Sequence, residues 1–291
     1  MSTIYLLKDF IRKLYCFSCL NEGVSSTPLF YLYRSIYKKL MSMISRSLFS
    51  FGLLADTLAY AENQKKVEKK AIAELDLKKI IQVDFPDDQY YKVQTKKKQI
   101  VLHHTVSGQG VDGDIAWWRS TADHIATSMI VGFDGKIYQC FSSKYWAHHL
   151  GCKRSNNVAL NKGSIGIEID AWGGLVRHNR LWYPAKWDKE LKRNVANTSV
   201  RPISNVQTYE QGFRGFHAFE KYTDAQLEAV YKLLIYWKSR YGIPLTYNPA
   251  MWEVNEDALN GKAGVWTHVS FREDKSDCHP QPELIAMLKS L

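Results

Sequence analysis

Apolar and polar positions alternate with a period of two in several short stretches after residue 98, which is typical of strands in a packed sheet. The stretch from Ser164 to Asp170 alternates most clearly, and an apolar run that ends in His103 and His104 predicts a short buried strand. Residues 132–135 (Gly-Phe-Asp-Gly) are expected to form a hairpin turn, because Asp-Gly favours the positive φ angles of such turns. The predicted strands are residues 99–104, 125–131, 136–141 and 164–170.

A helical period replaces this alternation after Thr223. Thr223 and Gln226 have the spacing of a capping box, in which the glutamine side chain returns to the amide of the N-cap residue. Gly242 is expected to end the helix. Between these residues the apolar positions recur at helical spacing: Leu227, Val230, Leu233, Leu234 and Trp237.

The remaining segments after residue 98 complete the pattern of a compact α/β domain. Asp114 is a plausible N-cap for a helix over residues 114–119. Residues 283–288 are predicted to form the first part of a closing helix that runs close to the C-terminus. Residues 255–263 are expected to form a polar loop. Residues 171–222 contain many aromatic and turn residues without a long helical pattern, so we expect an insertion of short strands and loops.

The chain before this domain is basic and apolar. No uninterrupted apolar run in residues 1–40 approaches the roughly 18–20 residues of a membrane span. Residues 41–61 form a second such stretch that ends in Ala59-Tyr-Ala61, a pattern that signal peptidases cut. An amphipathic or poorly ordered helix and a signal or membrane-surface anchor both remain open. Residues 62–82 are expected to be a partly helical linker, which gives an extension over residues 1–82 and a domain over 83–291.

The net charge and the cysteine content limit the classes of binding partner and the disulfide bonds to be expected. The net charge is +10, and residues 1–100 carry 17 Lys/Arg against 10 Asp/Glu. A nucleic-acid-binding domain would concentrate this excess on itself, so we expect the protein to bind no nucleic acid. The basic N-terminal segment is expected to make at most weak contact with a membrane surface. We also expect a monomer. The five cysteines, which include Cys16 and Cys19, indicate free thiols without a disulfide framework.

Residues 266–280 hold the densest candidate chemistry, because imidazole, carboxylate and thiolate are the side chains that bind zinc. This stretch contains His268, Asp277, Cys278 and His279. A metal site needs a further ligand from elsewhere, and His103 is the best candidate. The plan of a catalytic zinc site is then met by three groups: His103, His268 and Asp277 as zinc ligands, Glu168 as general base and Lys275 as oxyanion donor.

Five short motifs occur in the order of a known family, over about residues 98–291. They are Val101-Leu-His-His-Thr105, the strand before Asp134-Gly135, Ala147-His-His-Leu-Gly151, Ser164-Ile-Gly-Ile-Glu168, and His268 through Lys275-Ser-Asp277 to Pro280. In these motifs the chain resembles the zinc-dependent N-acetylmuramoyl-L-alanine amidases, which include phage lysozymes of the amidase type and animal peptidoglycan recognition proteins. The resemblance implies a central mixed β-sheet flanked by helices, with the N-terminal helical extension in front of it.

The resemblance also implies a site, residue by residue. The first two zinc ligands fall on His103 and His268, and the third is Asp in some branches and Cys in others. Lys275-Ser-Asp277 fits the spacing of the Asp branch, so Asp277 is favoured over Cys278 and His279. In that branch the catalytic carboxylate is Glu168; other branches use a tyrosine at the position of Thr127. His148 and Asn157 match family residues at the substrate groove and are expected to bind substrate. Trp146 is expected to bind substrate as an aromatic side chain that can stack on a sugar ring.

The expected function is therefore peptidoglycan hydrolysis at the amide between N-acetylmuramic acid and L-alanine. Zinc-activated water attacks the carbonyl, Glu168 takes the proton, and Lys275 stabilises the oxyanion. A phage or prophage endolysin that acts at the bacterial cell wall is expected, although a host enzyme for wall remodelling fits as well. The alternative from a different class is a recognition module that binds peptidoglycan without cleaving it.

Overall fold

The computed structural model describes residues 56–67, 69–70, 75, 77–108, 110–121 and 123–291. The chain divides into two units, residues 1–67 and 68–291. Within the first unit, residues 56–67 are helical and include the Ala59-Tyr-Ala61 pattern. Cys16, Cys19 and the possible membrane-surface segment before residue 56 lie outside the described residues. No helix in the described part of the chain is long and apolar enough to cross a membrane.

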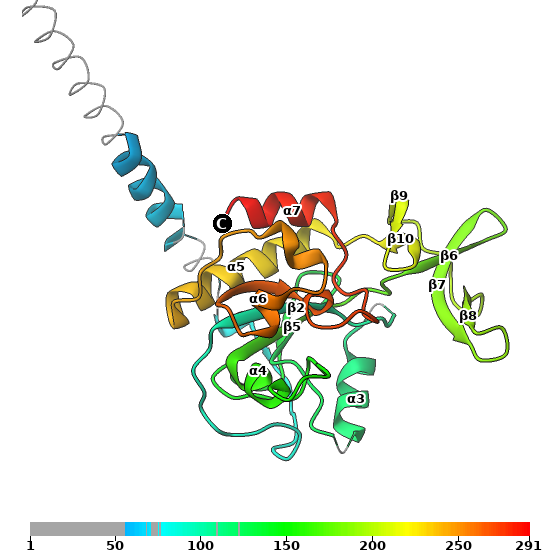
Figure 1. Ribbon diagram of the computed structural model, residues 1–291, viewed down its shortest axis with the longest axis horizontal. Coiled ribbons are helices and arrows are strands. Elements are labelled where there is room, and N and C mark those ends of the chain that lie inside the picture. The colour runs from blue at the N-terminus through cyan, green and yellow to red at the C-terminus, as the bar shows by residue number, and fades with distance from the viewer. Residues whose placement is uncertain (1–55, 68, 71–74, 76, 109, 122) are drawn as a thin grey trace, which may run out of the picture. The chain divides into compact units, whose positions relative to one another are not determined.

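A six-stranded mixed sheet forms the centre of the second unit (Figure 1). Its order is β1-β4-β3-β5-β2-β11, and every neighbouring pair is parallel except β3 and β4. This arrangement confirms the predicted α/β class and the mixed sheet. The strands are β1 (Ile81–Gln82), β2 (Gln99–His104), β3 (Met129–Val131), β4 (Ile137–Gln139), β5 (Ser164–Ile169) and β11 (Gly264–Thr267).

The sheet extends into the predicted linker at one edge and is shorter than predicted within the domain. β1 pairs with β4 in parallel, so residues 81 and 82 belong to the sheet, while the domain boundary at 82–83 stays a prediction. The strand expected over residues 125–131 begins only at Met129. Before it, the Thr127 hydroxyl donates to the Met129 carbonyl at 3.0 Å, and Ile125 forms a single parallel bridge with His148.

The two faces of the sheet have different roles, because successive side chains of a strand point to opposite faces. Leu102 and Ile167 are register partners on the face that packs into the main core. Two helices supply residues to the same core, α5 (Asp224–Tyr241) and α7 (Pro282–Lys289). His103 and Glu168, one residue further along their strands, face the other way.

Helix α5 follows the sequence prediction closely. The Thr223 hydroxyl accepts a hydrogen bond from the Gln226 amide at 3.1 Å, and the Gln226 side chain accepts from the Thr223 amide at 2.9 Å. Gly242 ends the helix with a φ of 70°, a left-handed conformation that glycine adopts without steric cost. Leu233, Leu234 and Trp237 are fully buried.

Two local predictions were wrong. Helix α3 (Asp112–Ser120) begins before Asp114, with Val111 at the N-cap position. Asp114 does not cap the helix because its carboxylate accepts a hydrogen bond from Ser107 at 3.0 Å. The predicted polar loop at 255–263 contains α6 (Glu256–Leu259), which the Asn255 side chain caps by accepting from the amides of Asp257 and Ala258. The shorter helical elements are α4 (Asn157–Gly163), η1 (Leu77–Lys79), η2 (Pro249–Trp252) and η3 (His268–Ser270).

The predicted insertion at 171–222 is an arm of five strands (Figure 1). A three-stranded antiparallel sheet precedes a two-stranded hairpin. The base of the arm is tied to the domain through the buried His279 ring, whose Nδ1 lies 2.7 Å from the Tyr209 hydroxyl and which stacks on Phe219 at 4.6 Å. The strands are β6 (Leu175–His178), β7 (Leu181–Asp188), β8 (Arg193–Ala196), β9 (Val206–Phe213) and β10 (Phe216–Glu220).

Candidate active site

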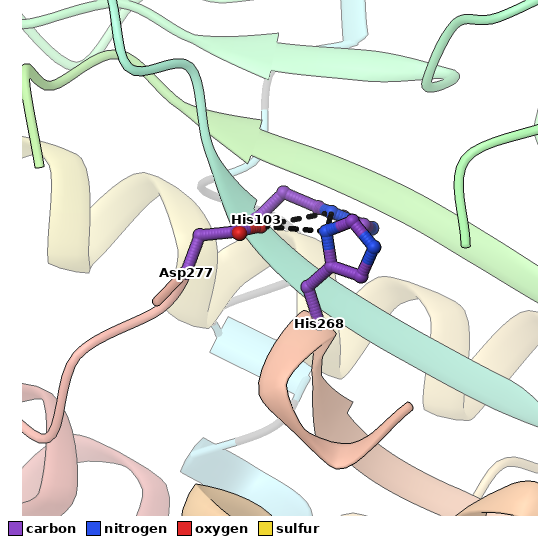
Figure 2. Close-up of side chains that lie close together, drawn as sticks. All are labelled: His103, His268 and Asp277. Atoms are coloured by element: carbon purple, nitrogen blue, oxygen red, sulfur yellow. Dashed lines mark hydrogen bonds and ion pairs between the residues drawn. The ribbon is translucent and has the colours of Figure 1, made fainter. Parts of the chain in front are cut away.

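Three buried side chains that are far apart in the sequence converge at the end of the sheet (Figure 2). His103, His268 and Asp277, called here the His–His–Asp cluster, each present one potential ligand atom, and these atoms lie within 4.8 Å of one another. The Nδ1 atoms of the two imidazoles are 3.0 Å apart. The Asp277 Oδ2 atom lies 3.2 Å from Nδ1 of His103 and 2.9 Å from Nδ1 of His268.

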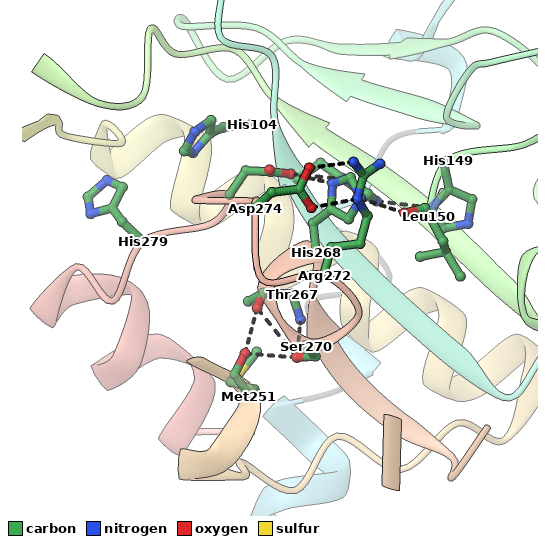
Figure 3. A network of polar contacts seen from close by, with 12 residues as sticks. His104, His149, Leu150, Met251, Thr267, His268, Ser270, Arg272, Asp274 and His279 are labelled. Carbon is green, nitrogen blue, oxygen red and sulfur yellow. Dashed lines mark hydrogen bonds and ion pairs between the residues drawn. The ribbon is translucent and has the colours of Figure 1, made fainter. Parts of the chain in front are cut away.

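The parallel arrangement of β11, β2 and β5 brings this cluster together. Thr267, the last residue of β11, pairs with Leu102 in β2, so His268 emerges beside His103. Thr267 and Ser270 both donate a side-chain hydrogen bond to the Met251 carbonyl, which anchors the turn that carries His268 (Figure 3). The Val269 amide donates to the Asp277 carbonyl at 3.1 Å and holds the following loop against this turn.

A cavity of about 1050 Å³ opens onto the cluster. Glu168 lines it as the register partner of His103 on the neighbouring strand β5. The buried Glu168 Oε2 atom has no hydrogen-bond partner among the described residues. Lys275 lines the cavity beside Asp277, and Trp117 on α3 lines it with 56% of its surface exposed. A carboxylate with a buried oxygen atom and a lysine thus line the same space as the cluster.

Burial sets the protonation states within the site. It lowers the pKa of His103 to about 4, with a further contribution from His268. Burial also raises the pKa of Glu168 well above its usual range, and the nearby Asp277 carboxylate adds to this effect. For Asp277 burial acts to raise the pKa, but contacts with His268 and His103 outweigh it and hold the pKa well below its usual range. A neutral His103 and an ionised Asp277 are the states in which these side chains bind metals.

Comparison with known families decides what this site belongs to. The sequence profile described as N-acetylmuramoyl-L-alanine amidase matches residues 93–281. The matched span covers more than half of the chain and includes the whole cluster and Glu168. The chain belongs to this family. It is therefore an amidase enzyme, and the family's substrate is peptidoglycan.

The amidase is also similar to solved structures, although the similarity is distant. The structure of PlyL is 12% identical to it, with a TM-score of 0.40, and the match covers 72% of this chain and 96% of that chain. The N-acetylmuramoyl-L-alanine amidase LysC from Clostridium intestinale is 15% identical, with a TM-score of 0.36 and coverage of 72% and 97%. The catalytic domain of XlyA is 15% identical, with a TM-score of 0.40 and coverage of 72% and 98%. Comparison with curated protein sequences finds no match.

The two alternative metal ligands, Cys278 and His279, lie apart from the cluster, and so does His104. The Cys278 thiol is fully buried and hydrogen-bonds with the Tyr222 hydroxyl. His279 contacts Tyr209 and the Glu220 carbonyl at the base of the arm. His104 lies on the opposite face of β2, where its Nδ1 atom is 2.9 Å from the Tyr222 hydroxyl (Figure 3). Of the three alternatives for the third ligand, only Asp277 therefore lies with His103 and His268. Its assignment as a metal ligand stays a prediction.

The three predicted substrate-binding residues have different environments. His148 lines the cavity, half-buried. Asn157 also lines it, but its side-chain oxygen accepts from the Cys152 amide at 2.9 Å and so supports the loop. Trp146 is buried and stacks on Tyr91 with ring centroids 3.9 Å apart, and it is not among the described residues that line the cavity. We therefore do not carry Trp146 forward as a substrate contact.

Sequence reasoning missed one residue at the site. His149, rather than its neighbour His148, contacts the cluster: its Nδ1 atom lies 2.9 Å from Nε2 of His103. The two histidines are adjacent in an extended segment, so they point in different directions. The Ala-His-His-Leu-Gly motif alone does not indicate which of them turns inward.

Proposed function

We propose that the amidase is a zinc enzyme that hydrolyses the amide between the lactyl group of N-acetylmuramic acid and L-alanine. The observation that carries this proposal is the buried His–His–Asp cluster with the Glu168 carboxylate beside it in one cavity, where the Oε2 atom has no hydrogen-bond partner among the described residues. Family membership supports the bond that is cleaved.

The donor set fits zinc. Two imidazole nitrogens and one carboxylate oxygen are ligands that Zn²⁺ prefers, and three protein ligands leave one position open for catalysis. All three side chains are buried, and their ligand atoms already point toward a common point. A zinc ion held by His103, His268 and Asp277 would act as a Lewis acid on water and on the scissile carbonyl.

Glu168 supplies the base in this mechanism. Burial raises the pKa of Glu168 above its usual range, and a general base works best when its pKa lies near the operating pH rather than far below it. Glu168 takes the proton of the attacking water as the new carbon–oxygen bond forms. It returns that proton to the alanine nitrogen as the carbon–nitrogen bond breaks, so that the products are a lactyl carboxylate and a free amino terminus.

Lys275 supplies a positive charge to the same cavity. Its ammonium group donates a hydrogen bond to the oxyanion that develops on the carbonyl oxygen. Such stabilisation acts in the transition state rather than on the bound substrate. Lys275 is therefore proposed as the second catalytic residue.

The cavity walls fit a glycopeptide. His148 and Trp117 also line the cavity, and an exposed indole can stack on a sugar ring. We propose these two residues, with a smaller contribution from Asn157, as substrate contacts. The place of action is the bacterial cell wall, as expected of a phage or prophage endolysin.

The test uses purified cell-wall peptidoglycan and protein with a measured zinc content. Zinc-loaded protein is expected to bind the wall and to release new alanine amino termini. Binding to the wall without release would support the recognition-module alternative and overturn the proposed catalysis. Protein that holds no zinc after reconstitution would overturn the metal assignment.

A further inference from the structure

We propose that a two-residue segment, His149 and Leu150, orients both histidines of the cluster from the side away from the metal. The proposal rests on the zinc site described above and deepens it. His149 is assigned as a positioning residue for His103, and the Leu150 carbonyl takes the same part for His268. Figure 3 shows both residues of the segment close to the cluster.

A chain of hydrogen bonds fixes the tautomer of His103. If Nδ1 of the neutral His103 ring is to bind a metal, the proton must be on Nε2. That Nε2–H then donates to Nδ1 of His149 at 2.9 Å. His149 must in turn hold its proton on Nε2, which lies 2.8 Å from the Ser164 hydroxyl.

The chain ends in a group that can only accept. The Ser164 hydroxyl donates to the Leu160 carbonyl at 2.8 Å. Because the Leu160 carbonyl has no proton to give, the Ser164 hydroxyl must be the donor to it. The Ser164 oxygen then accepts from Nε2–H of His149, and Nδ1 of His149 accepts from Nε2–H of His103. The direction of the chain agrees with a metal-binding lone pair on Nδ1 of His103.

His268 is held in the same way by Leu150, the residue after His149. Its Nε2 atom lies 2.8 Å from the Leu150 carbonyl, which can only accept. The proton of the neutral ring is therefore on Nε2, and Nδ1 presents its lone pair to the cluster. Two adjacent residues thus set the tautomers of two ligands that are separated by 165 positions.

The segment is itself anchored on both sides. The fully buried Asn161 side-chain oxygen accepts hydrogen bonds from the amides of His149 and Leu150, at 2.8 and 3.1 Å. On the other side, the His149 ring lies against Gly166 of β5, where a Cβ atom would come within 3.0 Å of Nδ1. The absence of a side chain at position 166 leaves space for the ring next to His103.

The test measures zinc affinity by competition with a chelator. His149→Phe keeps an aromatic ring and removes the acceptor, and we expect it to weaken zinc binding by roughly 10- to 100-fold, as loss of such outer partners typically does. His149→Asn retains an acceptor near the position of Nδ1 and should recover part of this loss. His148→Phe changes the neighbouring residue as a matched control and should leave zinc affinity unchanged.

The results separate this inference from the proposed function. Wild-type protein that fails to bind zinc overturns the zinc site itself. Wild-type protein that binds zinc tightly, together with a His149→Phe variant of equal affinity, overturns only the positioning role.

A second measurement needs no variant and so does not depend on the folding of one. Nitrogen NMR of the zinc-loaded wild-type protein should show the Nε2–H tautomer for His103, His149 and His268. A proton on Nδ1 of His149 would contradict the hydrogen-bond chain.

Discussion

His103 and Glu168 are register partners on the neighbouring parallel strands β2 and β5, and their side chains face the same side of the sheet. The strand register alone places a carboxylate beside a candidate metal ligand. A slip of one residue would turn Glu168 toward the opposite face, because side chains alternate with a period of two. Pairing between two parallel strands therefore positions the central elements of the proposed chemistry.

Glu168→Gln tests the proposed base with a side chain of nearly the same shape. The amide cannot accept the proton of water, so we expect the rate of peptidoglycan hydrolysis to fall by about 10²- to 10⁴-fold. Zinc content should remain at the wild-type level, because Glu168 is not a proposed ligand. Hydrolysis at the wild-type rate would exclude Glu168 as the base.

Asp277→Ala and Cys278→Ala form a matched pair that tests the third ligand. Only the Asp277 carboxylate contacts His103 and His268, whereas the Cys278 thiol hydrogen-bonds with Tyr222. We expect Asp277→Ala to lose zinc and activity, and Cys278→Ala to keep both with a lower thermal stability. Metal analysis of both variants after dialysis is the measurement; loss of zinc in the cysteine variant alone would reverse the assignment.

Lys275→Met tests the oxyanion role. Removal of one such donor from an active site typically lowers kcat by about 10²- to 10³-fold, and we expect a loss of this size with little change in KM. Lys153→Met, at an exposed lysine that is not among the described residues lining the cavity, serves as the control. A change in KM with an unaltered kcat would instead indicate that Lys275 binds the substrate in its ground state.

Because Lys97 is buried, we expect the free energy of unfolding to depend on pH in a way that has no connection with catalysis. Burial lowers the pKa of Lys97 from 10.5 to about 7, although its ammonium group donates to the carbonyls of Lys162 and Ser164. Between these two pH values the unfolded chain holds a proton that the folded chain has released, so the free energy of unfolding should rise with pH. Below about pH 7 both states are protonated, and the dependence should disappear.

Lys97→Met removes this contribution, and Lys98→Met at the exposed neighbour is the control. Because each pKa unit corresponds to about 1.4 kcal/mol, the difference between the two variants should change by several kcal/mol across this pH range. Urea unfolding of metal-free protein at pH 7, 8, 9 and 10 measures it. Parallel pH profiles for the two variants would show that the Lys97 ammonium remains charged in the fold.

The parts of the fold that local chemistry determines could be predicted from the sequence. Helix α5 has apolar residues at helical spacing between a Thr223 capping box and Gly242, and each of these signals lies within a few residues of the structure that it predicts. The helix at Asp114 was misplaced because Ser107, outside the predicted helix, competes for the Asp114 carboxylate. A side-chain contact of this kind leaves no periodic pattern in the sequence.

The same distinction applies to the site. His103, His268 and Asp277 were grouped from their chemistry and from family motifs, and the structure brings their ligand atoms together. The packing of Trp146 on Tyr91 joins residues 55 positions apart and could not be read from either local sequence. The inward turn of His149 depends on the anchoring of its amide by Asn161 and on the space beside Gly166, which also become adjacent only in the fold.

The most direct test of the account is mass analysis of the products formed from a purified N-acetylmuramoyl pentapeptide. Zinc-loaded protein should yield N-acetylmuramic acid with a free lactyl carboxylate and an intact peptide that begins with L-alanine. A chelator should abolish both products, and added zinc should restore them. A substrate that remains intact with zinc-loaded protein, or that is cut at any other bond, would contradict the central claim.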